Sequence, residues 1–289
     1  WGIPLWAFYV NRGQGVCSFG LRDKDHPLAE FLPANWAYQL VHRQGFRTFI
    51  RLQADKATTH YEPFTMDGAR NAACTQTLHA RPHELVLREQ NPAVGLETEV
   101  TYFTLPHESL AALVRIMKIR NTGTRTTAAW VLDGLPFVVP HGLGDSMLKN
   151  LRYIAQPHIE VVGLAERTPG FRTKASTEDS AVVEEVRGVN FSFGYEAVFP
   201  HELLLPLVDP TVVFGTATDL GYPEFLLRED GVRVPGRQMT ENQFPSALFL
   251  AEWKLKPGEE RTLCSFHGHA SDTAQLTLFA QRARSSGYV

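Results

Sequence analysis

Two polar and aromatic stretches near the amino terminus, residues 9–13 and 33–39, carry side chains suited to sugar binding. Amide and guanidinium groups satisfy hydroxyls, and aromatic rings can cover the apolar C–H face of a sugar ring. A different interpretation stays open, because Trp36 and Tyr38 also suit a protein core and Asn35 suits a turn. The candidate sugar-binding residues are Tyr9, Asn11, Arg12, Asn35, Tyr38 and Gln39.

His267-Gly268-His269 is the most metal-like motif of the chain. Alternate residues of a strand share one face, so both imidazoles could point at one ion, but a zinc site needs at least a third protein ligand. A hairpin through Pro257 and Gly258 predicts the residues that face this strand, and it brings no carboxylate close. We therefore expect no metal here. The predicted register places Leu248 opposite His267, Ser246 opposite His269 and Glu252 opposite Leu263.

General acid–base chemistry on a sugar would need a histidine and a carboxylate on its two sides. His141 and Glu252 are conceivable partners, although no spacing rule joins them. The chain carries no GxSxG elbow, P-loop or dinucleotide fingerprint, so nucleophilic hydrolase and nucleotide chemistry have no support. We expect no cofactor and no catalytic residue within the chain.

Charge and cysteine usage exclude several classes of partner. The net charge is −3 and no run of basic residues occurs, which argues against nucleic acid and against a membrane surface. No apolar stretch approaches the roughly 20 residues of a membrane span. The three cysteines, Cys17, Cys74 and Cys264, are widely spaced and odd in number. They predict free thiols in a reducing compartment, with a cytoplasmic location.

Short apolar segments rich in β-branched and aromatic residues, separated by Gly, Pro, Asn and Asp, predict an all-β protein. We expect hairpin turns at 121–123 and 256–259, an irregular segment at 55–82, and a helix at 272–284 with Asp272 as its cap. Strands without alternating helices favour a large antiparallel sandwich. The predicted strands are residues 5–10, 15–22, 46–53, 84–90, 96–105, 113–120, 126–132, 158–162, 181–186, 190–197, 211–214, 246–255 and 261–270.

Several longer runs resemble the amino-terminal part of cellobiose-phosphorylase-like glycoside phosphorylases, especially those acting on β-1,3-oligoglucans. The resemblance begins with Gly-Ile-Pro-Leu-Trp-Ala-Phe-Tyr-Val-Asn-Arg-Gly at 2–13 and spans nearly the whole chain. Its further segments are Ser-Phe-Gly at 18–20, Phe-Leu-Pro-Ala-Asn at 31–35, Tyr-Gln at 38–39, Gly-Phe-Arg-Thr-Phe-Ile at 45–50, Lys-Ile-Arg-Asn-Thr-Gly at 118–123, Lys-Ala-Ser-Thr-Glu-Asp-Ser at 174–180, Val-Asp-Pro at 208–210, Phe-Gly at 214–215 and Leu-Lys-Pro-Gly-Glu-Glu at 255–260.

The resemblance implies a galactose-mutarotase-like β super-sandwich over residues 1–271, with 272–289 starting a helical linker. It further implies a downstream (α/α)₆ barrel in the same polypeptide, which carries the aspartate general acid while inorganic phosphate attacks a β-linked gluco-oligosaccharide with inversion. Relatives commonly form homodimers in which the sandwich borders the partner's active site. The barrel lies outside this chain, so we expect the isolated chain to be inactive. Its role would be substrate binding and dimerisation.

Two other functions remain open from the sequence. A free-standing carbohydrate-binding sandwich would need an exposed row of aromatic side chains. A mutarotase-like aldose epimerase would need its own acid and base.

Overall fold

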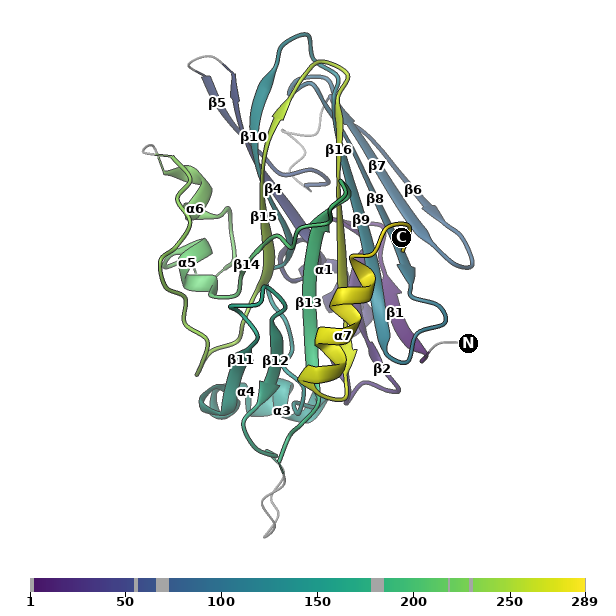
Figure 1. Ribbon diagram of the computed structural model, residues 1–289, viewed down its shortest axis with the longest axis vertical. Coiled ribbons are helices and arrows are strands. Elements are labelled where there is room, and N and C mark those ends of the chain that lie inside the picture. The colour runs from purple at the N-terminus through teal and green to yellow at the C-terminus, as the bar shows by residue number, and fades with distance from the viewer. Residues whose placement is uncertain are drawn as a thin grey trace.

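The computed structural model describes residues 3–54, 57–65, 73–177, 185–217, 219–228 and 231–288. Its strands form three antiparallel sheets (Figure 1). The eight-stranded sheet has the order β11 (Ile159–Val162), β12 (Gly170–Thr173), β13 (Val189–Glu196), β16 (Glu260–Ala270), β9 (Ala111–Asn121), β8 (Leu96–Thr104), β7 (Leu85–Asn91), β6 (Thr75–Ala80). The five-stranded sheet has the order β14 (Leu205–Leu207), β15 (Ala247–Leu255), β10 (Thr127–Leu135), β4 (Arg47–Ala54), β5 (Ala57–Tyr61). The three-stranded sheet is β1 (Leu5–Tyr9), β2 (Val16–Leu21) and β3 (Pro27–Ala29).

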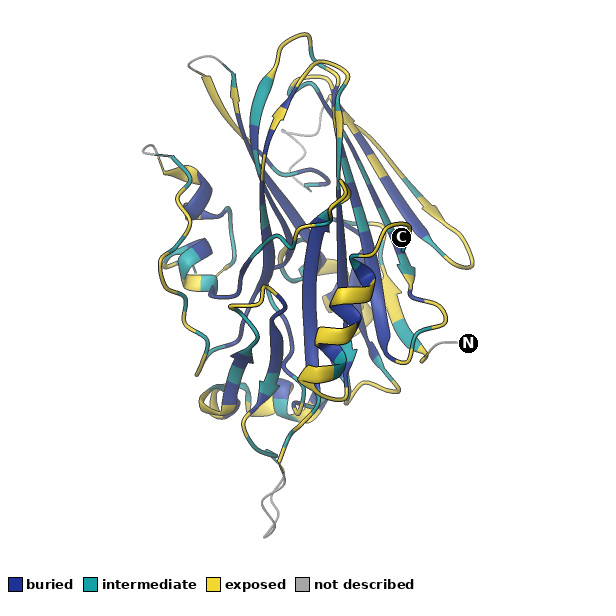
Figure 2. Cartoon of the chain, in the orientation of Figure 1, coloured by how far each residue is buried: buried dark blue, intermediate teal, exposed yellow. Residues whose placement is uncertain are grey.

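The two large sheets pack face to face, and period-two alternation supplies their common core. Along β8 every second residue up to Tyr102 is buried, as expected for a strand with one face inward. Val100, Met117 and Val131 from three strands are fully enclosed in this core. Figure 2 shows the buried residues concentrated on the large sheets, with exposed residues along the rims.

Helices cover both outer faces of the sandwich. Helix α7 (Thr273–Ala283) packs Phe279 onto Phe193 and Phe266 of the eight-stranded sheet. The short helices α5 (Pro210–Phe214) and α6 (Glu224–Leu227) cover the five-stranded sheet, where Phe214 contacts Phe49. The remaining helical segments are α1 (Ala34–Gln44), α3 (Asp145–Asn150), α4 (Arg152–Ala155) and η1 (Gln156–His158).

The predicted fold class is confirmed: the chain is an antiparallel β sandwich with a carboxy-terminal helix. The Asp272 side chain caps α7 by accepting a hydrogen bond from the Gln275 amide at 2.7 Å. Helix α7 lies against the sheet along its buried face, rather than leaving the sandwich. Among the described residues, none of the helices combines the length and apolarity that crossing a membrane requires.

Both predicted hairpins are wrong. The turn at 121–123 joins β9 to β10, and the turn at 256–259 joins β15 to β16, so each connects the two sheets. The two connections bond to each other instead, since Gly258 donates to the Asn121 carbonyl at 2.8 Å and Asn121 Nδ2 donates to Leu255 O at 3.0 Å. Turn chemistry sets where a chain reverses, but it leaves open which strands then pair.

Helix is also more widespread than predicted. Helix α1 is as long as α7, and the predicted strand at 211–214 is α5, which begins after the Asp209 cap with Pro210 in its first turn. The predicted irregular segment contains β5 and β6, polar strands at the edges of their sheets. The predicted strand at 181–186 lies largely outside the described residues.

Candidate functional site

The two candidate sugar-binding stretches lie side by side. The Arg12 guanidinium carbon stands 3.8 Å from the centre of the Tyr38 ring, a cation–π contact between the β1–β2 turn and α1. We call the six predicted residues Tyr9, Asn11, Arg12, Asn35, Tyr38 and Gln39 the Arg12–Tyr38 surface. All except Arg12, which is half-buried, are exposed.

Helix α1 positions half of this surface. Its Ala37 and Val41, four residues apart, are buried against Cys17 and Leu32. Asn35, Tyr38 and Gln39 follow the i, i+3, i+4 spacing that places side chains on one helix face, and this face is turned outward. The helix interpretation of residues 34–44 could have been drawn from the spacing of Ala37 and Val41, followed by a glycine at 45.

A hollow of about 230 Å³ adjoins the surface, and we call it the Arg47 hollow. Arg47 Nε and Nη2 bind the two Glu62 carboxylate oxygens at 2.6 and 2.8 Å, so the charged pair has a fixed orientation. Gly13 at the rim has φ +52°, and a Cβ there would stand 3.3 Å from the His42 Cα. A glycine therefore lets the β1–β2 turn approach α1 closely.

His42 lies at the wall of this hollow and holds one buried polar atom, Nδ1, without a hydrogen-bond partner among the described residues. Burial first, and then the charges of Arg43, Arg47 and Arg12, lower the pKa of this imidazole.

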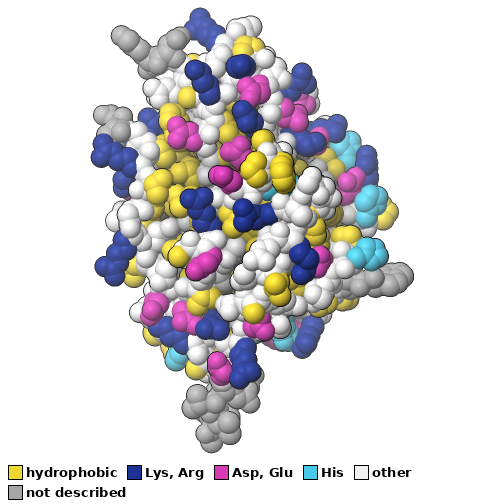
Figure 3. Space-filling view, in the orientation of Figure 1, with side chains coloured by type: hydrophobic (Ala, Val, Ile, Leu, Met, Phe, Trp, Pro, Cys, Tyr) yellow, Lys and Arg dark blue, Asp and Glu magenta, His cyan; other side chains and the backbone are white. Residues whose placement is uncertain are grey.

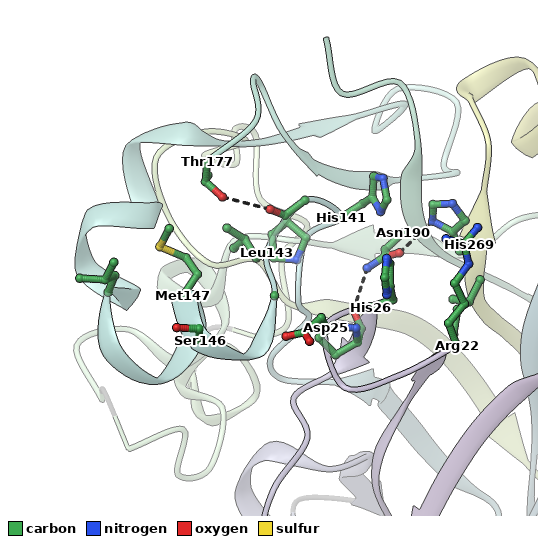
Figure 4. A pocket seen from close by; sticks show the side chains of 16 residues that line it. Arg22, Asp25, His26, His141, Leu143, Ser146, Met147, Thr177, Asn190 and His269 are labelled. Atoms are coloured by element: carbon green, nitrogen blue, oxygen red, sulfur yellow. Dashed lines mark hydrogen bonds between the residues drawn. The ribbon is translucent and has the colours of Figure 1, made fainter. Parts of the chain in front are cut away.

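A larger pocket, of about 530 Å³, opens at one end of the sandwich (Figure 4). Its walls come from the β2–β3 connection, the segment between β10 and α3, α3 itself, and the ends of β13 and β16. We call it the histidine pocket. It is lined by Leu21, Arg22, Asp25, His26, Pro27, Pro140, His141, Gly142, Leu143, Gly144, Ser146, Met147, Leu151, Thr177, Asn190 and His269.

The histidine pocket holds His141 and His269 as neighbouring rings, 4.5 Å apart between centroids. Asn190 Nδ2 donates to the carbonyls of Pro27 and Val139 at 3.1 and 2.9 Å, so its Oδ1 accepts from His269 Nδ1 at 3.1 Å. The His269 Nε2 is therefore an acceptor in the neutral ring. The His141 ring has no hydrogen-bond partner among the described residues.

Burial lowers the pKa of both rings. The pKa of His141 falls to about 4 through burial and, secondarily, the charge of His26. The pKa of His269 falls to about 3 through burial, with His141, His26 and Arg22 adding to the effect. Both imidazoles are neutral at physiological pH.

A separate layer of polar side chains lies between the two large sheets. Fully buried Arg115 on β9 binds both oxygens of Asp133 on β10, at 3.1 and 2.6 Å, and Gln14, Thr48 and Tyr102 complete its hydrogen bonds. A buried ion pair whose hydrogen-bonding groups all have partners fixes the position of one sheet relative to the other. The sequence pattern did not mark this layer, because its residues come from four separate strands and one turn and meet only in the folded chain.

The predicted histidine pair does not converge on one point. His267 bonds Ser192 and Ser265 inside the sandwich, at 2.9 and 3.0 Å, whereas His269 reaches the histidine pocket. The predicted register is wrong, because β16 pairs with β13 and β9 and not with β15. Within the described ranges, no group of three or more His, Cys, Asp or Glu side chains is placed to hold a metal ion.

The conceivable acid–base pair is also not brought together. His141 lines the histidine pocket, whereas Glu252 is exposed on β15 beside a different hollow. The residues that sequence reasoning missed include Asp25, His26 and Asn190 of the histidine pocket. For Asp25 and His26, the only signal in the sequence was the run of charged residues at 22–26 between two short apolar segments. That run does not indicate which distant residues, such as Asn190, would lie beside it.

Comparison with known proteins supplies the fold class and no family. No protein-family model matches the sequence, and no curated protein matches it. Among solved structures, the chain is similar to a polysaccharide lyase, with a TM-score of 0.51 and 10% sequence identity. The match covers 97% of this chain and 34% of the lyase chain, so this chain spans about a third of that protein's length. The likeness shows a shared β-sandwich architecture.

Proposed function

We propose that this chain is the amino-terminal β-sandwich domain of an inverting β-glucan phosphorylase and that it contacts the glucan through the Arg12–Tyr38 surface. The observation that carries the proposal is the contact of Arg12 with Tyr38. It joins the two stretches that show the resemblance to glycoside phosphorylases into one exposed surface. The sandwich architecture, shared with a polysaccharide lyase, supports a role in carbohydrate metabolism.

The exposure of aromatic rings supports glucan contact. Tyr9 is 52% exposed, Trp36 54% and Tyr38 39%. Exposed aromatic rings that lie close together can cover the apolar C–H face of a sugar ring. The adjoining Arg47 hollow offers the Arg47–Glu62 pair to sugar hydroxyls.

The finer parts of the proposal follow the resemblance. Inorganic phosphate is the co-substrate, and the general acid belongs to an (α/α)₆ barrel that follows in the same polypeptide. The sandwich also takes part in a homodimer, in a reducing cytoplasmic compartment. Figure 3 shows acidic and basic side chains interspersed over the visible face, with no large area of a single charge.

The proposal is tested first by binding. We expect the chain to bind laminari- or cello-oligosaccharides, and we expect Tyr38→Ala to weaken that binding about tenfold or more, which corresponds to about 1.4 kcal/mol. Tyr153, 85% exposed on α4, provides the matched control. Calorimetric titration that finds equal affinities for Tyr38→Ala and Tyr153→Ala would remove the Arg12–Tyr38 surface from the proposal.

A further inference from the structure

We infer that the histidine pocket is a second binding site, separate from the Arg12–Tyr38 surface, for an uncharged polyhydroxylated ligand of one or two sugar rings. Its volume of about 530 Å³ lies within the roughly 300–1,000 Å³ of small-molecule sites. Its lining residues indicate which kind of ligand it fits.

The lining combines an apolar wall with convergent polar groups. Figure 4 shows Leu143 and Met147 on one side of the pocket, opposite His141 and His269. Thioether and aliphatic groups suit the C–H face of a sugar ring. Imidazole nitrogens suit its hydroxyls, because a hydroxyl both donates and accepts. The unpartnered His141 ring is the group that such a ligand would satisfy.

The charges of the lining favour a neutral ligand over an anion. His141 and His269 carry no charge near neutral pH, for the reasons given above. The cation Arg22 shares the lining with the carboxylate of Asp25, and Asp23 holds the third histidine, His26, at 2.8 Å. No cluster of cations is therefore available among the described lining residues to hold a phosphate.

A glycine behind the rings sets their position. Gly188 does not line the pocket, yet a Cβ there would stand 2.6 Å from His141 Nε2 and 2.9 Å from His269 Cε1. A methyl group at 188 would have to displace both imidazoles. These are side-chain ends, so the geometry of the pocket changes at little cost to the sheet. Gly188→Ala therefore probes the site without touching a lining residue.

The experiment titrates the purified chain with glucose, laminaribiose, cellobiose and inorganic phosphate, followed by protein-observed NMR. We expect saturable binding of at least one sugar, weakened tenfold or more by Gly188→Ala and by His141→Phe. Gly236→Ala, where a Cβ meets nothing within 4 Å, is the matched control and should bind as the parent chain does. Thermal unfolding of each variant shows whether the fold persists.

Four results would overturn the inference. The first is the absence of saturable sugar binding to the parent chain, and the second is unchanged sugar binding in both Gly188→Ala and His141→Phe. The third is phosphate binding that equals or exceeds sugar binding and is lost in the same variants. Tyr38→Ala separates this site from the proposed glucan surface, because binding in the histidine pocket should persist when Tyr38 is removed. Sugar binding that Tyr38→Ala abolishes would belong to the other surface and would also count against the inference.

Discussion

Single histidines in this chain have very different environments, and burial decides their protonation. His267 is fully enclosed between the sheets, beside Phe46, Ser192 and Ser265. Burial first, and the charge of Arg115 second, lower the pKa of His267 to about 3. The ring is therefore neutral in the folded protein at every pH where the protein is expected to work.

This depressed pKa predicts acid sensitivity. A histidine has a pKa of about 6.5 when unfolded, so the unfolded state binds more protons than the folded state between pH 6.5 and about 3. The free energy of unfolding then falls as pH falls through that window, by about 2 kcal/mol from this residue between pH 7 and pH 5. Over the same interval, the free energy of unfolding of His267→Gln should fall by about 2 kcal/mol less than that of the parent chain. Urea unfolding at both pH values measures this difference. His79→Gln on β6, where the side chain is exposed, is the control for the substitution itself. An equal loss in the parent chain and in His267→Gln would contradict the prediction.

At the scale of elements, we expect a buried ion pair that crosses the sandwich to contribute more to stability than a surface ion pair between neighbouring strands. Arg115 and Asp133 lie on β9 and β10, which are consecutive in sequence but belong to different sheets. Their ion pair joins the two layers in the middle of the core. Removing one partner leaves the other charge buried without compensation, which typically costs about 3–5 kcal/mol.

We therefore expect Asp133→Leu and Arg115→Met each to lower the free energy of unfolding by about 3–5 kcal/mol. The double variant should be less destabilised than the sum of the two, because no uncompensated charge remains. Glu99→Gln, which breaks the surface pairs with Arg88 and Lys118, should cost less, about 1 kcal/mol. Denaturant unfolding of the four variants gives these values, and additive single effects would show that the pair does not act as a unit.

The helix that closes the outer face depends on its cap. Asp272 accepts from the Gln275 amide at 2.7 Å, and loss of such a cap costs about 1 kcal/mol. Asp272→Ala should lower the thermal midpoint, whereas Asp272→Ser or Asp272→Asn should restore most of it because both residues cap well. Identical midpoints for Asp272→Ala and Asp272→Asn would show that the cap contributes nothing to α7.

At the scale of the whole molecule, the proposal divides a phosphorylase into a sandwich that contacts glucan and a barrel that performs the chemistry. Inverting transfer to phosphate needs a positioned acid to protonate the leaving oxygen, and such catalysis contributes about 10²–10⁴-fold.

We expect these 289 residues alone to release no sugar 1-phosphate from cellobiose, laminaribiose or longer β-glucans. A longer protein that includes the downstream barrel should release it, and Arg12→Ala in that protein should weaken substrate use by raising KM. Arg81→Ala, which alters an exposed arginine that lines neither surface, serves as the control. Robust turnover by the isolated chain would contradict the proposal that the barrel performs the chemistry.

Local patterning in the sequence was sufficient for the class of fold, for most strands and for the capped helix α7, because alternation and capping depend on neighbours within a few residues. It also singled out Arg12 and Tyr38 as candidate sugar-binding residues, and that role stays a prediction. Only the tertiary structure decided that these two side chains touch, because their contact depends on how α1 packs against β2. Likewise, β15 and β16 follow one another through a tight turn yet belong to different sheets, since each gains more core contact with strands distant in sequence. The histidine pocket is tertiary for the same reason: residues 26, 141, 190 and 269 meet only when strands from both halves of the chain end at the same place.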